Sequence, residues 1–321
     1  MAGDDVALRI ALSSYGHTLA LKSGAVPIEG VRPVFAEIPN MIEAYRRMVR
    51  DVAFDISELA PTTYFAARLA GAPYKALPIF VMRRFHHGGV LCRADAGIAA
   101  PRDLAGKRFG LRAYSVTSAV WTRAILAENH GLDLQQVTWV TDSEEHVETL
   151  RLPPNVQRAP ANRSLGAMLM AGDLDAAFAG LPGMGAPGGG GAMTERSRLH
   201  ELFSDAAAME ADWYRRTGIY PIHGLIVIRD DVRAAFPWLP RALFAACLRA
   251  KDAYVAALRA GLGETDDDRR YRGLMALVGD PLPYGLAANR AAIDSLVDQS
   301  YRQGLIARRP GIDELFIDID G

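Results

Sequence analysis

The chain has 321 residues, of which 50% are hydrophobic and 23% are charged, and its formal net charge is −1 at pH 7. This composition is typical of a folded globular protein and excludes an intrinsically disordered one. The balance of 36 Lys and Arg against 37 Asp and Glu argues against a nucleic-acid-binding protein, which normally carries a basic excess. At roughly 150 residues per domain, the length predicts about two domains.

The N-terminal sequence and the cysteines bear on the location of the protein. No basic segment followed by a long apolar run opens the sequence, and no stretch approaches the length of a membrane-spanning helix. Cys92 and Cys247 have no metal-binding or redox spacing, and we expect two free thiols in a reducing compartment. We therefore expect a cytoplasmic protein that contacts neither membranes nor nucleic acid.

The first part of the chain alternates strand-like and helix-like segments. Asn40 is expected to cap the first of the helices, and Gly71 to end the second. In chain order we expect strands at 6–12 and 28–38, a helix at 39–50, a strand at 54–59, a helix at 62–69, and strands at 75–81 and 89–92.

The alternation continues in the second part, and the last third becomes mainly helical. The glycine-rich segment 181–192 has no phosphate-binding motif and is expected to be a mobile surface loop. Strands that alternate with helices predict an α/β fold with mainly parallel sheets. The expected elements are strands at 107–111, 137–140, 174–179 and 224–228, and helices at 114–130, 165–171, 239–259, 266–278 and 287–303.

The loops at the carboxyl ends of the strands are where an open α/β sheet binds its ligands. Four of the seven histidines fall in or beside these loops: His17, His86, His87 and His223. Arginine binds a carboxylate through two hydrogen bonds, and histidine exchanges protons near neutral pH. Loops that combine these side chains are suited to binding an aromatic acid. The neighbouring polar residues are Tyr15, Glu58, Arg83, Arg84, Tyr114, Arg216 and Tyr220.

Each of these residues also has a structural interpretation. A histidine in a loop is often a packing residue, and Glu58 could instead cap a helix. The sequence contains no GxSxG, no HExxH and no GxGxxG before a helix, so hydrolases and dehydrogenases have little support. The prediction of a site therefore rests on the convergence of several residue types.

Segments at the same loops resemble the 4,5-dihydroxyphthalate decarboxylase family over most of residues 8–255. The DLAGKR turn is common to type II periplasmic-binding proteins, whereas the set SYxxT, SE, RxFxH and TGIxPI is more specific. The segments that carry the resemblance are Tyr15 and Thr18 in SSYGHT, Ser57-Glu58, Arg83, Phe85 and His87 in RRFHH, the DLAGKR turn at 103–108, and TGIYPI at 217–222.

The resemblance implies a two-lobed, type II periplasmic-binding-protein-like fold with mixed, mainly parallel sheets and a ligand between the lobes. Residues 1–93 with 222–321 would form the first lobe, and 94–221 the second. It also implies a carboxy-lyase of aromatic degradation that removes one carboxylate from 4,5-dihydroxyphthalate or a close analogue, giving protocatechuate. The alternative is a non-catalytic solute-binding protein of the same fold, and either protein could form a homo-oligomer.

The reaction that the resemblance implies needs an acid for a ring carbon and a cation for a carboxylate, and His87 is the histidine that matches the family motif. His87 is expected to donate the proton, Glu58 to contact the phenol or orient the histidine, and His223 to belong to the catalytic group. N–H groups at a helix start would assist binding. The expected substrate-binding residues are His17, Thr18, Arg83, His86, Tyr114, Ser115, Thr117 and Arg216.

Three positions depart from the family pattern. Arginine is usual at the positions of His17 and His86, and a Met-His pair is usual at His223-Gly224. The substrate could therefore be a different small aromatic carboxylic acid. These imidazoles with Glu58 could also bind zinc or a similar divalent ion; otherwise no cofactor is expected.

Overall fold

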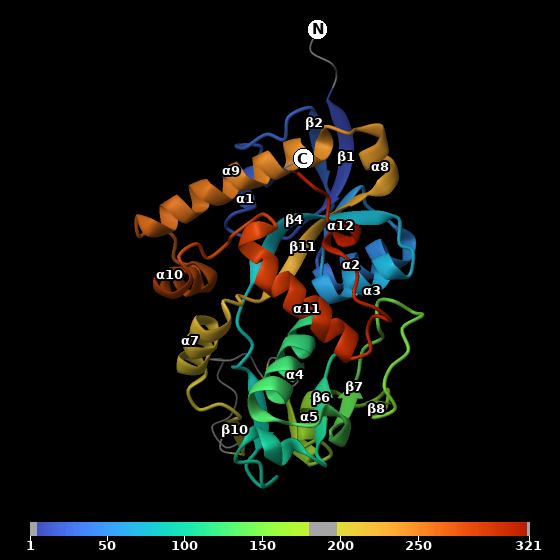
Figure 1. The fold of residues 1–321 in the computed structure, drawn as a ribbon, viewed down its shortest axis with the longest axis vertical. Coiled ribbons are helices and arrows are strands. Elements are labelled where there is room, and N and C mark those ends of the chain that lie inside the picture. Colours follow the sequence, from blue (N-terminus) through green and yellow to red (C-terminus); the bar gives the residue numbers. More distant parts are fainter. Residues whose placement is uncertain (1–4, 180–197, 320–321) are drawn as a thin grey trace. The chain divides into compact units, whose positions relative to one another are not determined.

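The computed structural model describes residues 5–179 and 198–319 (Figure 1). The expected glycine-rich loop at 181–192 lies outside these residues. The chain divides into two compact units. Unit 1 comprises Met1–Arg84, Ile222–Val297 and Arg308–Gly321, and unit 2 comprises Phe85–Pro221 and Asp298–Ala307.

This division differs from the expected one at two places. Residues 85–93 were placed with the first lobe, but β5 (Val90–Arg93) pairs with β9 (Ala176–Phe178) in the sheet of unit 2. Residues 298–307 also belong to unit 2, because Gln303 donates to the carbonyl of Val120 and accepts from Arg123. In both cases strand pairing or hydrogen bonding across a long sequence separation decides the boundary.

Unit 1 contains a five-stranded sheet in the order β2-β1-β3-β11-β4. β1 (Val6–Ala11) runs parallel to β2 (Val31–Phe35) and β3 (Ile56–Leu59). β11 (Ile222–Arg229) runs antiparallel to β3 and to β4 (Tyr74–Arg83). The carboxyl ends of β1, β3 and β4 and the beginning of β11 therefore lie along one edge of the sheet.

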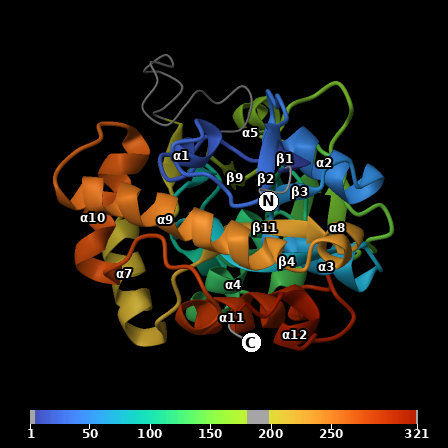
Figure 2. The same ribbon diagram turned by 90° about the horizontal axis from the view of Figure 1, so that it is seen from above.

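Both faces of this sheet are covered. On one face, Leu77, Ile79 and Val81 of β4 share a hydrophobic core with α9 (Leu239–Arg259), which crosses the strands (Figures 1 and 2). On the other face, Phe80 contacts Phe316, with ring centroids 6.0 Å apart. Alternate residues of a strand point to opposite faces, so a strand buried on both sides becomes continuously apolar, as residues 76–82 of β4 are. The other helices of unit 1 are α1 (Leu19–Lys22), α2 (Met41–Asp51), α3 (Pro61–Leu69), α8 (Asp230–Ala235), α10 (Asp266–Val278), η3 (Ala287–Asn289), α12 (Ile312–Leu315) and the first part of α11 (Arg290–Arg302).

Unit 2 contains a six-stranded sheet in the order β10-β5-β9-β6-β7-β8. β6 (Arg108–Leu111) is parallel to β7 (Thr138–Thr141) and to β9, whereas β5 is antiparallel to β9 and to β10 (Leu199–Glu201). Val140, Leu165, Leu169 and Ala177 form part of its core. The remaining elements are η1 (Pro101–Leu104), α4 (Thr117–His130), η2 (Leu134–Gln136), β8 (Val156–Arg158), α5 (Leu165–Ala171) and α7 (Ala206–Thr217).

No helix in the described part of the chain is long and apolar enough to cross a membrane.

Candidate functional site

A tight turn follows β1 at the strand-end edge of unit 1. Thr18 Oγ1 donates to the Ser13 carbonyl over 2.7 Å and accepts from the Tyr15 N–H over 2.8 Å. Gly16 lies against the ring of Tyr254, and a Cβ at this position would be only 2.2 Å from Tyr254 Cε2. The hydroxyl of Thr18, expected to bind substrate, is therefore used to close the turn.

Substituting Gly16 by alanine is expected to destabilise unit 1 by about 1–3 kcal/mol, because the added methyl group overlaps the ring of Tyr254. The Tyr254 hydroxyl donates to Asp268, which resists movement of that ring. Gly273→Ala is a matched control: this exposed position in α10 has nothing within 4 Å of the new Cβ, and alanine favours the helix. Urea unfolding of both variants checks the prediction, and equal midpoints would contradict it.

Glu58 is fully buried on β3 and fastens this turn to the sheet. Its Oε1 accepts the hydroxyl of Tyr15 over 2.8 Å and also the hydroxyl of Tyr45 from α2. Its Oε2 accepts the N–H of Ser13 over 3.1 Å. Glu58 does not cap the helix that follows, since the N-cap of α3 is Ala60 without a side-chain hydrogen bond. The carboxylate is held by groups from two neighbouring segments.

His17 is an uncharged imidazole at neutral pH. Its side chain is 1% exposed and stacks on Tyr15, with ring centroids 5.4 Å apart and planes at 1°. Burial lowers the pKa of His17 to about 4, although the backbone of Val81 and the charge of Asp267 oppose this shift. His17 therefore offers a neutral donor or acceptor in the free protein, and not a cation for a carboxylate.

Arg83 and His223 lie where β4 ends and β11 begins. The buried guanidinium of Arg83 lies 5.3 Å from the ring centroid of Phe80, and its carbonyl accepts from Arg270 over 2.7 Å. His223 follows Ile222, which pairs with Arg83, and its Nε2 is 3.4 Å from Arg84 Nη2. Unit 1 thus brings five of the predicted residues to one edge of its sheet: His17, Thr18, Glu58, Arg83 and His223.

In unit 2, the start of α4 holds a carboxylate of the chain itself. The N–H groups of Tyr114 and Ser115 donate to Glu145 Oε1 and Oε2, over 2.6 and 3.1 Å, and the Ser115 hydroxyl also donates to Oε2. A helix N-terminus attracts negative charge, which accounts for this arrangement. The donors expected to bind a substrate carboxylate at Tyr114, Ser115 and Thr117 are therefore partly used by Glu145, a residue that no sequence motif indicates.

His87 lies in a different part of unit 2. It lines a cavity of about 580 Å³ beside the last residues of α4, and Glu128 of that cavity is eleven residues beyond Thr117. That separation is roughly 16 Å along the helix axis. The structure brings His87 and Arg216 together and leaves Tyr114, Ser115 and Thr117 elsewhere. The lining residues are His87, Glu128, Asn129, His130, Asp205, Ala208, Met209, Asp212 and Arg216.

The ring of His87 is enclosed by aromatic side chains. Its centroid is 5.6 Å from that of Trp213 and 6.0 Å from that of Phe203, and its Nδ1 has no hydrogen-bond partner in the described part of the chain. Burial, followed by the charges of His130 and Arg216, lowers the pKa of His87 to about 4. The free protein therefore holds a neutral imidazole in this cavity.

The other two predicted residues of unit 2 have different surroundings. Arg216 is exposed, and its Nε donates to Asp212 over 2.9 Å, four residues earlier on α7. His86 is buried, its carbonyl accepts from Thr122 over 3.2 Å, and it does not line the cavity. Arg216 can meet a ligand in the cavity, whereas His86 is part of the packing around α4.

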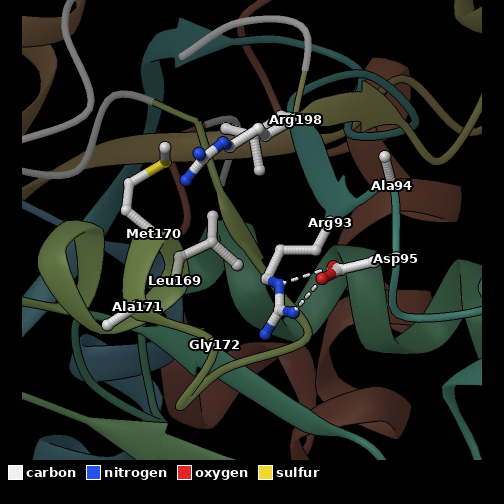
Figure 3. Close-up of a pocket in the computed structure, with 9 residues that line it drawn as sticks. Arg93, Ala94, Asp95, Leu169, Met170, Ala171, Gly172 and Arg198 are labelled. Carbon is white, nitrogen blue, oxygen red and sulfur yellow. Dashed lines mark hydrogen bonds and ion pairs between the residues drawn. The ribbon is translucent and has the colours of Figure 1, made fainter.

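A second cavity in unit 2, of about 380 Å³, contains none of the predicted site residues (Figure 3). Arg93 lines it, and its guanidinium faces the Asp95 carboxylate, with Nε and Nη2 donating over 2.9 and 2.6 Å. Arg198 and Met170 lie on another side. None of the described histidines lines this cavity, so it offers no side chain suited to donating a proton near neutral pH, and it is a weaker candidate than the one at His87.

A metal-binding arrangement of three or more His, Cys, Asp or Glu side chains is not present among residues 5–179 and 198–319. The proposal of a divalent ion at the histidines stays a prediction.

The chain has a type II periplasmic-binding-protein-like fold. Residues 29–178 match the family described as ABC transporter, phosphonate, periplasmic substrate-binding protein. The alkanesulfonate-binding protein SsuA from Xanthomonas axonopodis pv. citri, bound to MOPS, has a similar structure, with a TM-score of 0.54, 16% identity and 96% of each chain covered. The expected fold class, an α/β protein of this kind with mixed sheets, is confirmed.

Sequence relatives identify the family within this fold. The 4,5-dihydroxyphthalate decarboxylase of Comamonas testosteroni is 33% identical over 326 residues, which cover 96% of each chain. The 4,5-dihydroxyphthalate decarboxylase of Pseudomonas putida is 36% identical over 217 residues, which cover 65% of this chain and 81% of that protein. The chain belongs to the 4,5-dihydroxyphthalate decarboxylase family, as its sequence motifs indicated.

Proposed function

We propose that the chain is a carboxy-lyase that removes CO2 from 4,5-dihydroxyphthalate, or from a closely related hydroxylated aromatic diacid, and yields protocatechuate or its analogue. The observation that carries this proposal is the 33% identity to a decarboxylase of that name across 96% of both chains. The fold supports a small-molecule ligand, since a structural neighbour is a sulfonate-binding protein.

The reaction needs a proton at the ring carbon that bears the departing carboxylate. Loss of the proton from the hydroxyl para to this carbon pushes electrons into the ring, and protonation makes the carbon tetrahedral. The C–C bond to the carboxylate then breaks, CO2 leaves and the ring regains aromaticity. The protein must supply an acid for the carbon, an acceptor for the phenol proton, and a cation for the carboxylate that stays.

The cavity at His87 contains all three kinds of group. His87 is proposed to donate the proton, and Arg216 to hold the retained carboxylate. The carboxylates of Glu128, Asp205 and Asp212 offer acceptors for a phenolic proton. Ala208 and Met209 add an apolar wall that favours loss of a charged carboxylate as neutral CO2.

The residues of unit 1 are proposed to act mainly by fixing its strand-end edge. Glu58 binds two tyrosine hydroxyls and a backbone N–H, so its proposed role is to hold the turn that carries His17. His17 is proposed to act as a neutral donor or acceptor at this edge, and His223 stays a proposed member of the catalytic group. Arg83, which is buried against Phe80, is proposed to support the edge rather than to hold a carboxylate.

The first experiment is incubation of the purified chain with 4,5-dihydroxyphthalate and a small panel of phthalic and hydroxybenzoic acids, followed by mass spectrometry. We expect one compound to lose the mass of one CO2. Tight binding with every compound unchanged would overturn it and support a non-catalytic binding protein. A parallel incubation with EDTA tests the metal hypothesis, because a metal-dependent reaction would stop.

We also propose that the protein works in the cytoplasm. Cys92 and Cys247 are both buried free thiols, an arrangement typical of a reducing compartment. Cell fractionation tests this proposal, and recovery of the protein outside the cytoplasm would contradict it.

A further inference from the structure

We propose that His130 returns a proton to His87 after each turnover, and so acts as the connection between the buried imidazole and water. This inference rests on the proposed function, in which His87 protonates the substrate. Neither the sequence motifs nor the family resemblance assigned a role to His130.

The stoichiometry of decarboxylation creates the need for such a residue. An aromatic carboxylate and one proton give the arene and CO2, so each turnover consumes one proton. When His87 gives its proton to the ring carbon, it is left neutral. Its side chain is only 2% exposed, so the next proton must come from water through another group. Imidazole is suited to this task because it exchanges protons near neutral pH.

The geometry of the cavity points to His130. His130 and His87 line the same cavity, and their rings both contact Phe203, at centroid distances of 5.2 and 6.0 Å. Each ring has a nitrogen without a hydrogen-bond partner among the described residues, Nε2 in His130 and Nδ1 in His87. His130 is half-buried and is the last residue of α4, so it is more accessible to water than His87, which is buried.

Electrostatics favour one proton shared by the pair. The charge of His130 lowers the pKa of His87, and burial together with the charge of Arg102 lowers the pKa of His130. Protonation of either ring therefore opposes protonation of the other, which drives the proton onward to a substrate anion. The other charged groups around the two rings are Glu128, Asp205, Asp212 and Arg216 of the cavity and Glu210, which accepts from the N–H groups of His87 and Gly88.

The test is His130→Gln, assayed for CO2 release in dilute buffer. We expect kcat to fall at least about tenfold while kcat/KM stays near the wild-type value, because reprotonation follows CO2 release. Addition of imidazole to the buffer should restore kcat by supplying the proton directly. A purely structural role of His130 would not respond to imidazole.

Two further variants complete the experiment. His130→Asn repeats the test if the glutamine variant does not fold. His200→Gln is the control, because this histidine lies on β10, bonds the Ile98 carbonyl over 2.8 Å and does not line the cavity; it should keep wild-type kcat. Wild-type kcat for His130→Gln in dilute buffer, or a loss that imidazole does not restore, would overturn the relay. Absence of CO2 release from the wild-type chain would instead reveal, before any variant is made, that the proposed function itself is wrong.

Discussion

Replacement of His87 by glutamine is expected to lower kcat for CO2 release by about 10²–10⁴-fold, the range typical for loss of a general acid. Glutamine is similar in length and can keep the contacts with Phe203 and Trp213, but it cannot donate a proton to carbon. Steady-state assays with the substrate identified by mass spectrometry measure the effect. His200→Gln is again the control, and wild-type turnover by His87→Gln would contradict the assignment.

The pH dependence of kcat/KM tests the same assignment without a mutation. Burial lowers the pKa of His87 to about 4, so its protonated form is a minor species at neutral pH. If the imidazolium is the acid, kcat/KM should rise about tenfold for each unit that the pH falls between 7 and 5, because the protonated fraction rises by that factor. A neutral imidazole acting as a base would instead give a level profile that falls only below about pH 4. A level profile would therefore contradict proton donation by His87, and His87→Gln should lose the rising limb.

Regular elements were predictable where one periodicity dominates the sequence. Helices α9 and α10 begin and end at the residues expected from their apolar spacing. Asn40 caps α2 as expected, with its Oδ1 accepting from Ile42 over 3.0 Å, and Gly131 ends α4 with φ at 66°. These signals are local, so no knowledge of the tertiary structure is needed to find them.

Other elements were missed although local signals existed. Helix α7 was not predicted, although its first residues are rich in alanine. Asp205 caps this helix by accepting from Ala208 over 3.1 Å, and an acidic residue before an alanine run is a recognisable start. The strands β8 and β10 have only three residues each, too few to show a sequence pattern. They form because they pair with β7 and β5.

The composition of the site was only partly predictable, because its partners come from distant segments. The rule that ligands bind at strand ends selected loops of unit 1 that do lie along one edge of its sheet. It could not reveal that Glu58 is held by Tyr45, since nothing in the spacing of α2 distinguishes this tyrosine. Likewise, Glu145 reaches Ser115 only because β6 and β7 are neighbours in the sheet. His87 and Tyr114 are far apart because they lie near opposite ends of α4. A long helix in this segment was predicted from the sequence.

Replacement of Glu58 by alanine is expected to lower the free energy of unfolding by about 3 kcal/mol or more. It leaves two tyrosine hydroxyls and the Ser13 N–H without their acceptor, and an unsatisfied buried donor costs about 1–3 kcal/mol. Tyr45→Phe removes one donor and leaves the carboxylate bound by Tyr15 and Ser13, so it should cost only about 1 kcal/mol. Glu43→Gln, at an exposed position of the same helix as Tyr45, should change stability by less than about 0.5 kcal/mol.

Urea unfolding separates these three outcomes, and activity then separates the two roles of Glu58. If Glu58 only holds the turn that carries His17, Tyr45→Phe should retain most of its kcat, because the remaining hydrogen bonds of Glu58 keep the turn in place. If Glu58 contacts the substrate, Glu58→Gln should lose kcat even at temperatures where it is fully folded. A Glu58→Ala protein as stable as the wild type would contradict the structural role, because the network around this carboxylate would then contribute nothing to the fold.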